Sequence, residues 1–195
     1  MTPFFDPGPN PKGTPPIFLA GVGERMTEVA GRVADGFISH SFTTRRYLDE
    51  GTIPALRAGR IAAGRNPDAL GISVLGFVVT GETPAELDAA ARETKRQIAF
   101  YGSTPAYHAV LDLHGWAGLH ERLHAASRRG EWDTMAGMID DDMLAAFAVV
   151  GTPVEVAAQL VERYAGIAER VSFNAPYPVD PAVWRHVLNA LDAAA

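Results

Sequence analysis

The sequence predicts an α/β fold built on a parallel sheet. Short apolar segments suited to buried strands alternate along the chain with segments in which apolar residues recur at helical spacing. Residues 72–79 are apolar on both alternating faces, which is typical of a strand covered on both sides. Strands that alternate with helices usually form parallel sheets. The 195 residues suit a single domain over 1–195.

The first strand is expected after an irregular lead-in over residues 1–15, which is rich in proline and glycine. The apolar run 16–20 is the predicted strand, and it ends at the Gly21-Val22-Gly23 turn. A helix is predicted over 24–34. Its apolar residues share one face, namely Met26, Val29, Ala30 and Val33.

A second strand is expected at the apolar run 37–38, directly after an Asp-Gly turn signal, and it ends at Ser39-His40-Ser41. A helical stretch over 44–63 follows, in which Pro54 must occupy a break or a first turn. The third strand is 72–79. Thr83 and Glu86 then have the spacing of a capping box, so a helix is expected to run to about residue 100.

Residues 104–149 are predicted to be a helical insertion without a strand, and the aspartates 140–142 favour a helix start within it. Thr152 and Glu155 repeat the capping-box spacing. A fourth strand is expected over 171–175, followed by a last helix. Four strands are too few for a closed barrel of eight, which needs roughly 250 residues. The pattern therefore leaves two alternatives, a small open α/β sheet or half of a barrel.

Composition excludes several classes of function. The chain has no cysteine, which rules out disulfides, thiolate metal sites and a cysteine nucleophile. The formal net charge is −6 and no basic stripe is present, which argues against a nucleic-acid partner. No apolar run reaches the roughly 18–20 residues needed to span a bilayer. No signal-peptide pattern is found at the N-terminus, so a cytoplasmic location is expected.

One segment carries a more specific signal. The strand and turn Pro16-Ile-Phe-Leu-Ala-Gly-Val-Gly23, followed by Ala30-Gly-Arg-Val-Ala-Asp-Gly-Phe-Ile38, resemble the luciferase-like monooxygenase family. Residues 67–84 and 149–157 also resemble that family, in the same order. The resemblance implies a (β/α)₈ barrel and an oxidoreductase or monooxygenase that uses coenzyme F420 or FMN on a small organic substrate.

The resembling motifs belong to the C-terminal half of the family barrel. The N-terminal half, with the usual catalytic positions, has no counterpart in this sequence, so no catalytic residue is predicted. The chain is expected to correspond to half of a TIM barrel. One alternative is that this half is inactive by itself. A half-barrel exposes unpaired strand edges. We therefore expect a homodimer, or a complex with a separately encoded N-terminal half.

The glycine-rich turn is the predicted cofactor site. A strand that ends in such a turn at a helix start presents free backbone N–H groups and the positive end of the helix dipole, which suits a phosphate. The predicted cofactor-binding residues are Ala20, Gly21, Val22, Gly23, Arg25 and His40. Glu24 opposes this prediction, because its carboxylate repels phosphate. The plain alternative is a tight turn without a ligand.

Active sites of (β/α)₈ proteins lie at the C-terminal ends of the strands. Thr43 follows the second strand, whereas Asn174 and Tyr177 follow the last one, and these three are the predicted substrate-binding residues. Surface-loop and turn roles are the alternatives.

Two other functions compete with the oxidoreductase prediction. His120-Glu121-Arg122-Leu123-His124 matches the H-E-x-x-H pattern of zinc hydrolases. The charged Arg122 and the lack of a clear third ligand weaken that match, and an exposed helix is the alternative. The other candidate is a non-catalytic module that binds a phosphorylated ligand or serves as an interaction surface.

Overall fold

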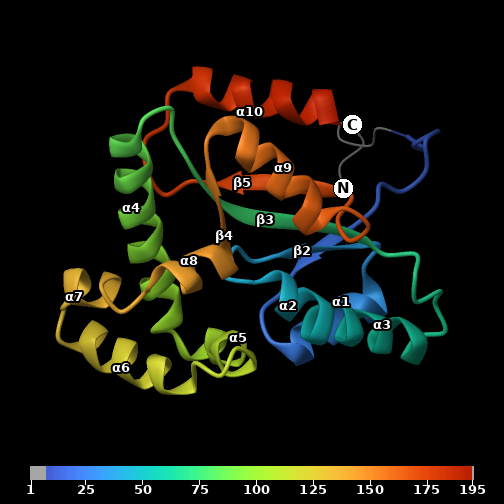
Figure 1. Ribbon diagram of the computed structural model, residues 1–195. Helices are drawn as coiled ribbons and strands as arrows, with labels where there is room; N and C mark the ends of the chain where they lie inside the picture. Colours follow the sequence, from blue (N-terminus) through green and yellow to red (C-terminus); the bar gives the residue numbers. More distant parts are fainter. Residues whose placement is uncertain (1–7, 195) are drawn as a thin grey trace.

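The computed structural model describes residues 8–194 (Figure 1). Its strands are β1 (Phe18–Ala20), β2 (Gly36–Ser39), β3 (Gly71–Thr80), β4 (Ala148–Gly151) and β5 (Arg170–Asn174). Its longer helices are α1 (Glu24–Val33), α3 (Ile53–Ala62), α4 (Pro84–Gly102), α6 (Ala117–Arg128), α9 (Pro153–Tyr164) and α10 (Pro181–Ala194). Its short helices are α2 (Arg45–Tyr47), a π-helical turn (Leu48–Thr52), a 3₁₀ turn (Pro105–Tyr107), α5 (His108–Leu113), α7 (Trp132–Ala136) and α8 (Asp141–Phe147).

All strand pairs in the described sheet are parallel, and β3 is its central member. The first half of β3 pairs with β2, where Gly71 lies opposite Gly36. Its middle pairs with β5 and its last four residues pair with β4. The parallel α/β architecture predicted from the sequence is therefore confirmed.

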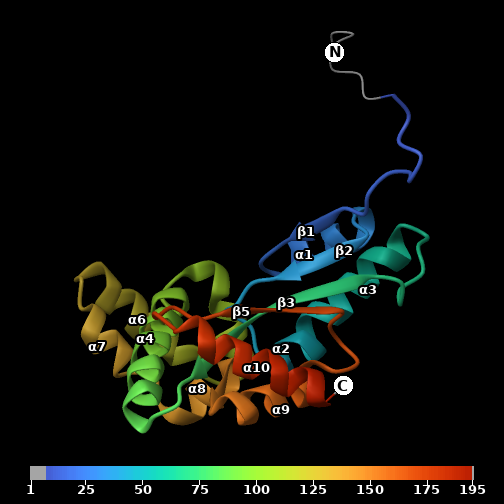
Figure 2. The same cartoon turned by 90° about the horizontal axis from the view of Figure 1, so that it is seen from above.

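The helices form two groups around the sheet (Figure 1). One core cluster joins the sheet to α1, α3, α9 and α10, with Phe37, Val74 and Val187 among its buried side chains. The second cluster joins the end of β3 to the helices between β3 and β4, through Phe77, Leu123 and Phe147. Figure 2 shows these intervening helices as a separate lobe beside the strand ends. This lobe is placed where it can cover the C-terminal ends of the strands.

The helix starts predicted from local spacing are confirmed. Capping boxes form at Thr83 with Glu86 and at Thr152 with Glu155, and each helix has a proline in its first turn. The side chain of Asp140 caps α8 by accepting a hydrogen bond from the Met143 amide. Pro54 lies in the first turn of α3, after the π-helical turn. Of the predicted lead-in, residues 1–7 lie outside the described part of the chain.

Two sequence predictions are wrong. The first is the strand-free insertion over 104–149, because Ala148 and Val149 begin β4, which pairs with Phe77 and Val78 of β3. Four residues placed directly after α8 carry too little pattern to separate a strand from a helix end.

The second error concerns the buried face of α1. Met26, Val29 and Val33 are 44–63% exposed, whereas Thr27, Ala30 and Gly31 are buried. The small residues permit close contact with α3: a Cβ added at Gly31 would lie 2.2 Å from the Leu56 carbonyl oxygen. Close backbone contact between two helices thus overrides the apolar pattern and leaves an exposed apolar stripe on α1. Among the described helices, none is long and apolar enough to cross a membrane.

Candidate active site at the strand ends

A cavity lies at the C-terminal ends of β1 and β2. Four of its lining residues were predicted from the sequence as site residues: Gly21, Val22, His40 and Thr43. The remaining lining residues are Thr27, Phe37, Ser39, Phe42, Tyr47, Thr52, Ala106, Tyr107 and Val110. Ala106, Tyr107 and Val110 come from the lobe between β3 and β4, so that lobe forms part of the cavity wall.

The N-terminus of α1 follows the lining residues Gly21 and Val22 along the chain and has no side-chain cap. Gly23 occupies the cap position with φ 78° and ψ 158°, a conformation that favours glycine. The first helical hydrogen bond runs from the Thr27 amide to the Gly23 carbonyl. No described group accepts a hydrogen bond from the amides of Glu24, Arg25 or Met26. A Cβ built at Gly23 would meet nothing within 4 Å, so the space in front of the turn is open.

Buried hydroxyl groups without partners lie in the same cavity wall. Ser39 and Thr43 are 4% and 8% exposed, and neither side-chain oxygen has a hydrogen-bond partner among the described residues. Buried polar groups are nearly always hydrogen-bonded, and leaving one unsatisfied costs about 1–3 kcal/mol. These two hydroxyls are therefore polar groups of the cavity wall whose hydrogen-bonding capacity the described residues leave unused.

His40 is held in one tautomer by its neighbours. The Phe42 amide donates a hydrogen bond to Nδ1 over 3.0 Å, so Nδ1 carries the lone pair and Nε2 carries the hydrogen. The Nε2–H group faces the Tyr107 hydroxyl at 3.2 Å. The Tyr107 ring stacks on the imidazole, and the Tyr101 ring meets it edge-on. Burial lowers the pKa of His40, which favours the neutral form.

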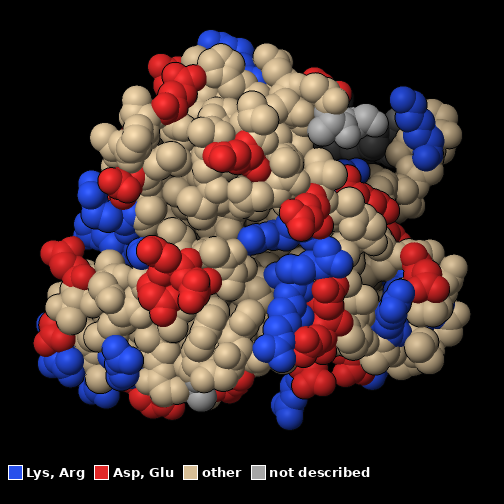
Figure 3. Space-filling model, viewed as in Figure 1, with Lys and Arg blue, Asp and Glu red and all other residues tan. Residues whose placement is uncertain are grey.

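No charged side chain lines the cavity among the described residues. Outside the lining, the Glu24 carboxylate adds to burial in raising the pKa of the lining residue Tyr47. Arg25 is exposed and makes no ion pair with a described residue, unlike Arg32 on the same helix, which pairs with Glu28 at 2.6 Å. Elsewhere the face in Figure 3 mixes both signs of charge. The ion pairs of the described residues include Arg45–Asp49 and Arg46–Glu50. Ala20, Gly23 and Arg25 adjoin the cavity along the chain and are not among its lining residues.

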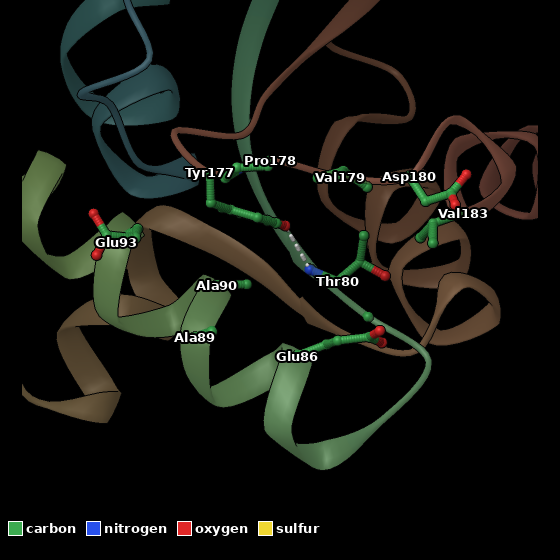
Figure 4. Close-up of a pocket in the computed structure, with 11 residues that line it drawn as sticks. Thr80, Glu86, Ala89, Ala90, Glu93, Tyr177, Pro178, Val179, Asp180 and Val183 are labelled. Carbon is green, nitrogen blue, oxygen red and sulfur yellow. Dashed lines mark hydrogen bonds between the residues drawn. The ribbon is translucent and has the colours of Figure 1, made fainter.

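Tyr177 and Asn174 lie away from this cavity. The Tyr177 hydroxyl accepts a hydrogen bond from the Thr80 amide at 2.8 Å and donates one to the Val78 carbonyl at 2.9 Å. It lines a second cavity between β3, α4 and the start of α10, which Figure 4 shows with Thr80 and Asp180. Asn174 lies in β5 opposite Phe77. The structure thus gives Tyr177 a bridging position on the β3 backbone.

The two histidines of the H-E-x-x-H motif fix α6 to the end of α4. His120 Nδ1–H donates to the Gly102 carbonyl at 2.8 Å, and His124 Nδ1–H donates to the Ser103 carbonyl at 3.1 Å. Within the described part of the chain, no group of three or more histidine or carboxylate side chains is arranged to hold a metal ion. This geometry favours the structural role over the zinc-hydrolase alternative.

Comparison with known sequences decides the family. The profile described as Luciferase-like monooxygenase matches residues 1–170. The chain belongs to this family. An uncharacterized protein of Mycobacterium tuberculosis is 47% identical over 190 residues, which cover 97% of this chain and 54% of that protein. The 5,10-methylenetetrahydromethanopterin reductase of Methanopyrus kandleri is 28% identical over 168 residues, covering 85% of this chain and 46% of the reductase. The chain of this luciferase-like protein spans about half the length of these relatives.

Solved structures show the same fold. The coenzyme F420-dependent tetrahydromethanopterin reductase of Methanopyrus kandleri superposes with a TM-score of 0.72 at 23% identity, over 92% of this chain and 50% of the reductase. A riboflavin lyase solved with modified FMN and riboflavin superposes with a TM-score of 0.58 at 23% identity, over 93% of this chain and 44% of the lyase. The α/β fold of this luciferase-like chain therefore matches TIM-barrel-like members of its family.

Several cavity residues were not predicted from the sequence. Tyr107 lies 67 positions from His40, and nothing in its local sequence marks it as a site residue. Ser39 is not among the site residues predicted from the sequence. A hydroxyl directly after a buried strand is the one signal that could have indicated it.

Proposed function

We propose that this luciferase-like chain binds coenzyme F420 or FMN through the phosphate of the cofactor, and that it forms part of an oxidoreductase acting on a small organic molecule. The uncapped N-terminus of α1 carries this proposal. Its free amides and the positive end of the helix dipole suit an anion, and Gly23 leaves room for close approach. The relatives named for F420 and FMN supply the two cofactor candidates.

The residues of the cavity fit such a ligand. Gly21 and Val22 in the cavity wall, with the adjoining Gly23 and Arg25, would hold the phosphate. The unpartnered hydroxyls of Ser39 and Thr43 would hydrogen-bond to polar groups of the cofactor. When bound, F420 or FMN supplies the redox chemistry, while the protein binds it, orients it and excludes water. His40 would face the bound ligand as a neutral imidazole with its hydrogen on Nε2.

A titration tests this proposal. F420 and FMN are added separately to the purified chain, with cofactor fluorescence and the melting temperature followed. A ligand that binds the folded state raises its melting temperature. A saturable shift with either compound supports the proposal. No response to either compound favours the second candidate, a non-catalytic module that binds a phosphorylated ligand or serves as an interaction surface.

We also propose that the chain associates, either as a homodimer or with an N-terminal half encoded separately. Among the described strands, β1 pairs only with β2, so its other edge is open. The exposed stripe of Met26, Val29 and Val33 lies on the following helix. Sedimentation of the chain alone tests this, and a monomer at all concentrations would contradict self-association. The cytoplasmic location stays a prediction from the sequence.

A further inference from the structure

We propose that Tyr107 and His40 form a subsite for the oxygen atom of an uncharged carbonyl or hydroxyl compound. In the proposed oxidoreductase this compound would be the substrate, so its identity as substrate rests on that proposed function. The subsite itself rests on the hydrogen-bond geometry and on the lining of the cavity, which are independent of any cofactor.

The first step of the argument is the direction of the hydrogen bonds. The Phe42 amide fixes the lone pair of His40 on Nδ1, so Nε2–H can only donate. Tyr107 Oη, 3.2 Å away, accepts that bond. The Tyr107 hydrogen then has no described acceptor, and it is free to donate to a ligand in the cavity that Tyr107 lines.

The second step is the chemistry of the surroundings. The cavity wall contains no lysine, arginine, aspartate or glutamate among the described residues. Phe37, Phe42 and Val110 supply apolar surface, and burial lowers the pKa of His40, which favours its neutral form. Burial also raises the pKa of Tyr107, which keeps its hydroxyl protonated. A neutral donor in a wall without charged side chains favours a neutral acceptor, since a charge that finds no counter-ion there would be costly to bury.

The third step concerns where the tyrosine comes from. Tyr107 ends the 3₁₀ turn of the lobe between β3 and β4, whereas His40 follows β2. The subsite therefore exists only when the lobe is docked on the strand ends. Docking is supported by stacking of the His40 and Tyr107 rings, with centroids 4.8 Å apart.

The test compares two uncharged probes. Cyclopentanone has a carbonyl oxygen, and methylenecyclopentane carries a CH₂ group in its place. Their dissociation constants are measured by NMR titration against the full chain, Tyr107→Phe and Tyr101→Phe. Tyr101 is the matched control, because its ring also contacts His40 and no hydrogen bond joins the two.

For the native chain, cyclopentanone should bind about fivefold more tightly than methylenecyclopentane, as expected of one neutral hydrogen bond. The preference should vanish in Tyr107→Phe and persist in Tyr101→Phe. It should not change with ionic strength, because the ligand is uncharged. The ¹⁵N spectrum of His40 should show hydrogen on Nε2. The ¹⁵N chemical shifts of the imidazole should change when cyclopentanone is added.

Equal preference in the native chain and Tyr107→Phe would overturn the subsite, and so would the absence of ketone binding or hydrogen on Nδ1. The ¹⁵N measurement uses the native chain, so it stands if Tyr107→Phe fails to fold. Failure of the cofactor titration is distinguishable: ketone binding without any response to F420 or FMN retains the subsite and removes the redox assignment.

Discussion

Thr44 and His114 are joined across 70 positions of the sequence by a 2.8 Å contact between Oγ1 and Nε2. The same hydroxyl caps α2 by accepting a hydrogen bond from the Tyr47 amide at 3.0 Å. His114 also stacks on Trp116, with ring centroids 4.4 Å apart. This pair ties the lobe between β3 and β4 to the segment that follows β2, close to the cavity residues Thr43 and Tyr47.

Acid should loosen this attachment. Burial lowers the pKa of His114, with a further contribution from Arg46, and burial also lowers that of His40. As the pH falls, these histidines therefore become protonated in the unfolded chain at a higher pH than in the folded chain. Their contribution to the free energy of unfolding is fully present above the unfolded histidine pKa of about 6.5 and decreases below it. Denaturant titrations at pH 7.5 and 5.5 should show lower stability at pH 5.5. The decrease should be smaller in His114→Gln, and an unchanged decrease would contradict the role of His114.

Anion binding should depend on the two charges at the start of α1. Arg25→Ala should weaken phosphate or cofactor binding a fewfold, and Glu24→Gln should strengthen it by a similar factor, because each changes the potential at the helix N-terminus. Both effects should shrink as salt rises. Arg32→Ala is the control, since Arg32 is engaged with Glu28 at the other end of the helix. Identical affinities in all three variants would contradict binding of the ligand at the Gly21–Gly23 turn.

The contact between α1 and α3 should not tolerate a methyl group. Gly31→Ala would place Cβ 2.2 Å from the Leu56 carbonyl oxygen, and the helices must separate to admit it. The expected loss is about 1–3 kcal/mol of unfolding free energy. Gly118→Ala in α6 meets nothing within 4 Å and should stabilise by about 0.5–1 kcal/mol. Urea unfolding of the two variants measures the contrast, and an unchanged midpoint in Gly31→Ala would be inconsistent with the close approach.

Tyr177→Phe distinguishes a substrate-binding role from a bridging role. Removing the hydroxyl leaves the Thr80 amide and the Val78 carbonyl without this partner, which should cost about 1–3 kcal/mol of stability. Cofactor affinity should stay within twofold, because the residue lines a different cavity. A large loss of ketone binding at native stability would instead support the substrate role predicted from the sequence.

Local features of this chain were predictable, and contacts between distant segments were not. The starts of α4 and α9 follow from Thr83 and Thr152, because a cap, a proline and a glutamate act within one turn. The buried face of α1 was mispredicted, since the small residue Gly31 contributes through its close contact with Leu56 of another helix. Strand β4 was missed because its pairing with β3 lies outside its own sequence.

In the candidate site, too, local features were predictable and contacts between distant segments were not. Gly21, Val22, His40 and Thr43 were predicted because strand ends and glycine turns are visible in the sequence, and the structure places all four in one cavity wall. The Tyr107 partner of His40 depends on how the lobe docks, which no local pattern encodes. Tyr177 was predicted from its position after the last strand, and its hydroxyl is engaged with the backbone of β3.

The staggered pairing of β3 also governs when this sheet can form during synthesis. Gly76 must meet Phe173, which leaves the ribosome long after β3 has emerged. Until then one edge of a buried, apolar strand stays unpaired, and such edges promote aggregation of nascent chains. Parallel pairings of this range also fold slowly. Expression of this protein should therefore benefit from lower temperature and from chaperones that shield β3 until the C-terminal strand arrives.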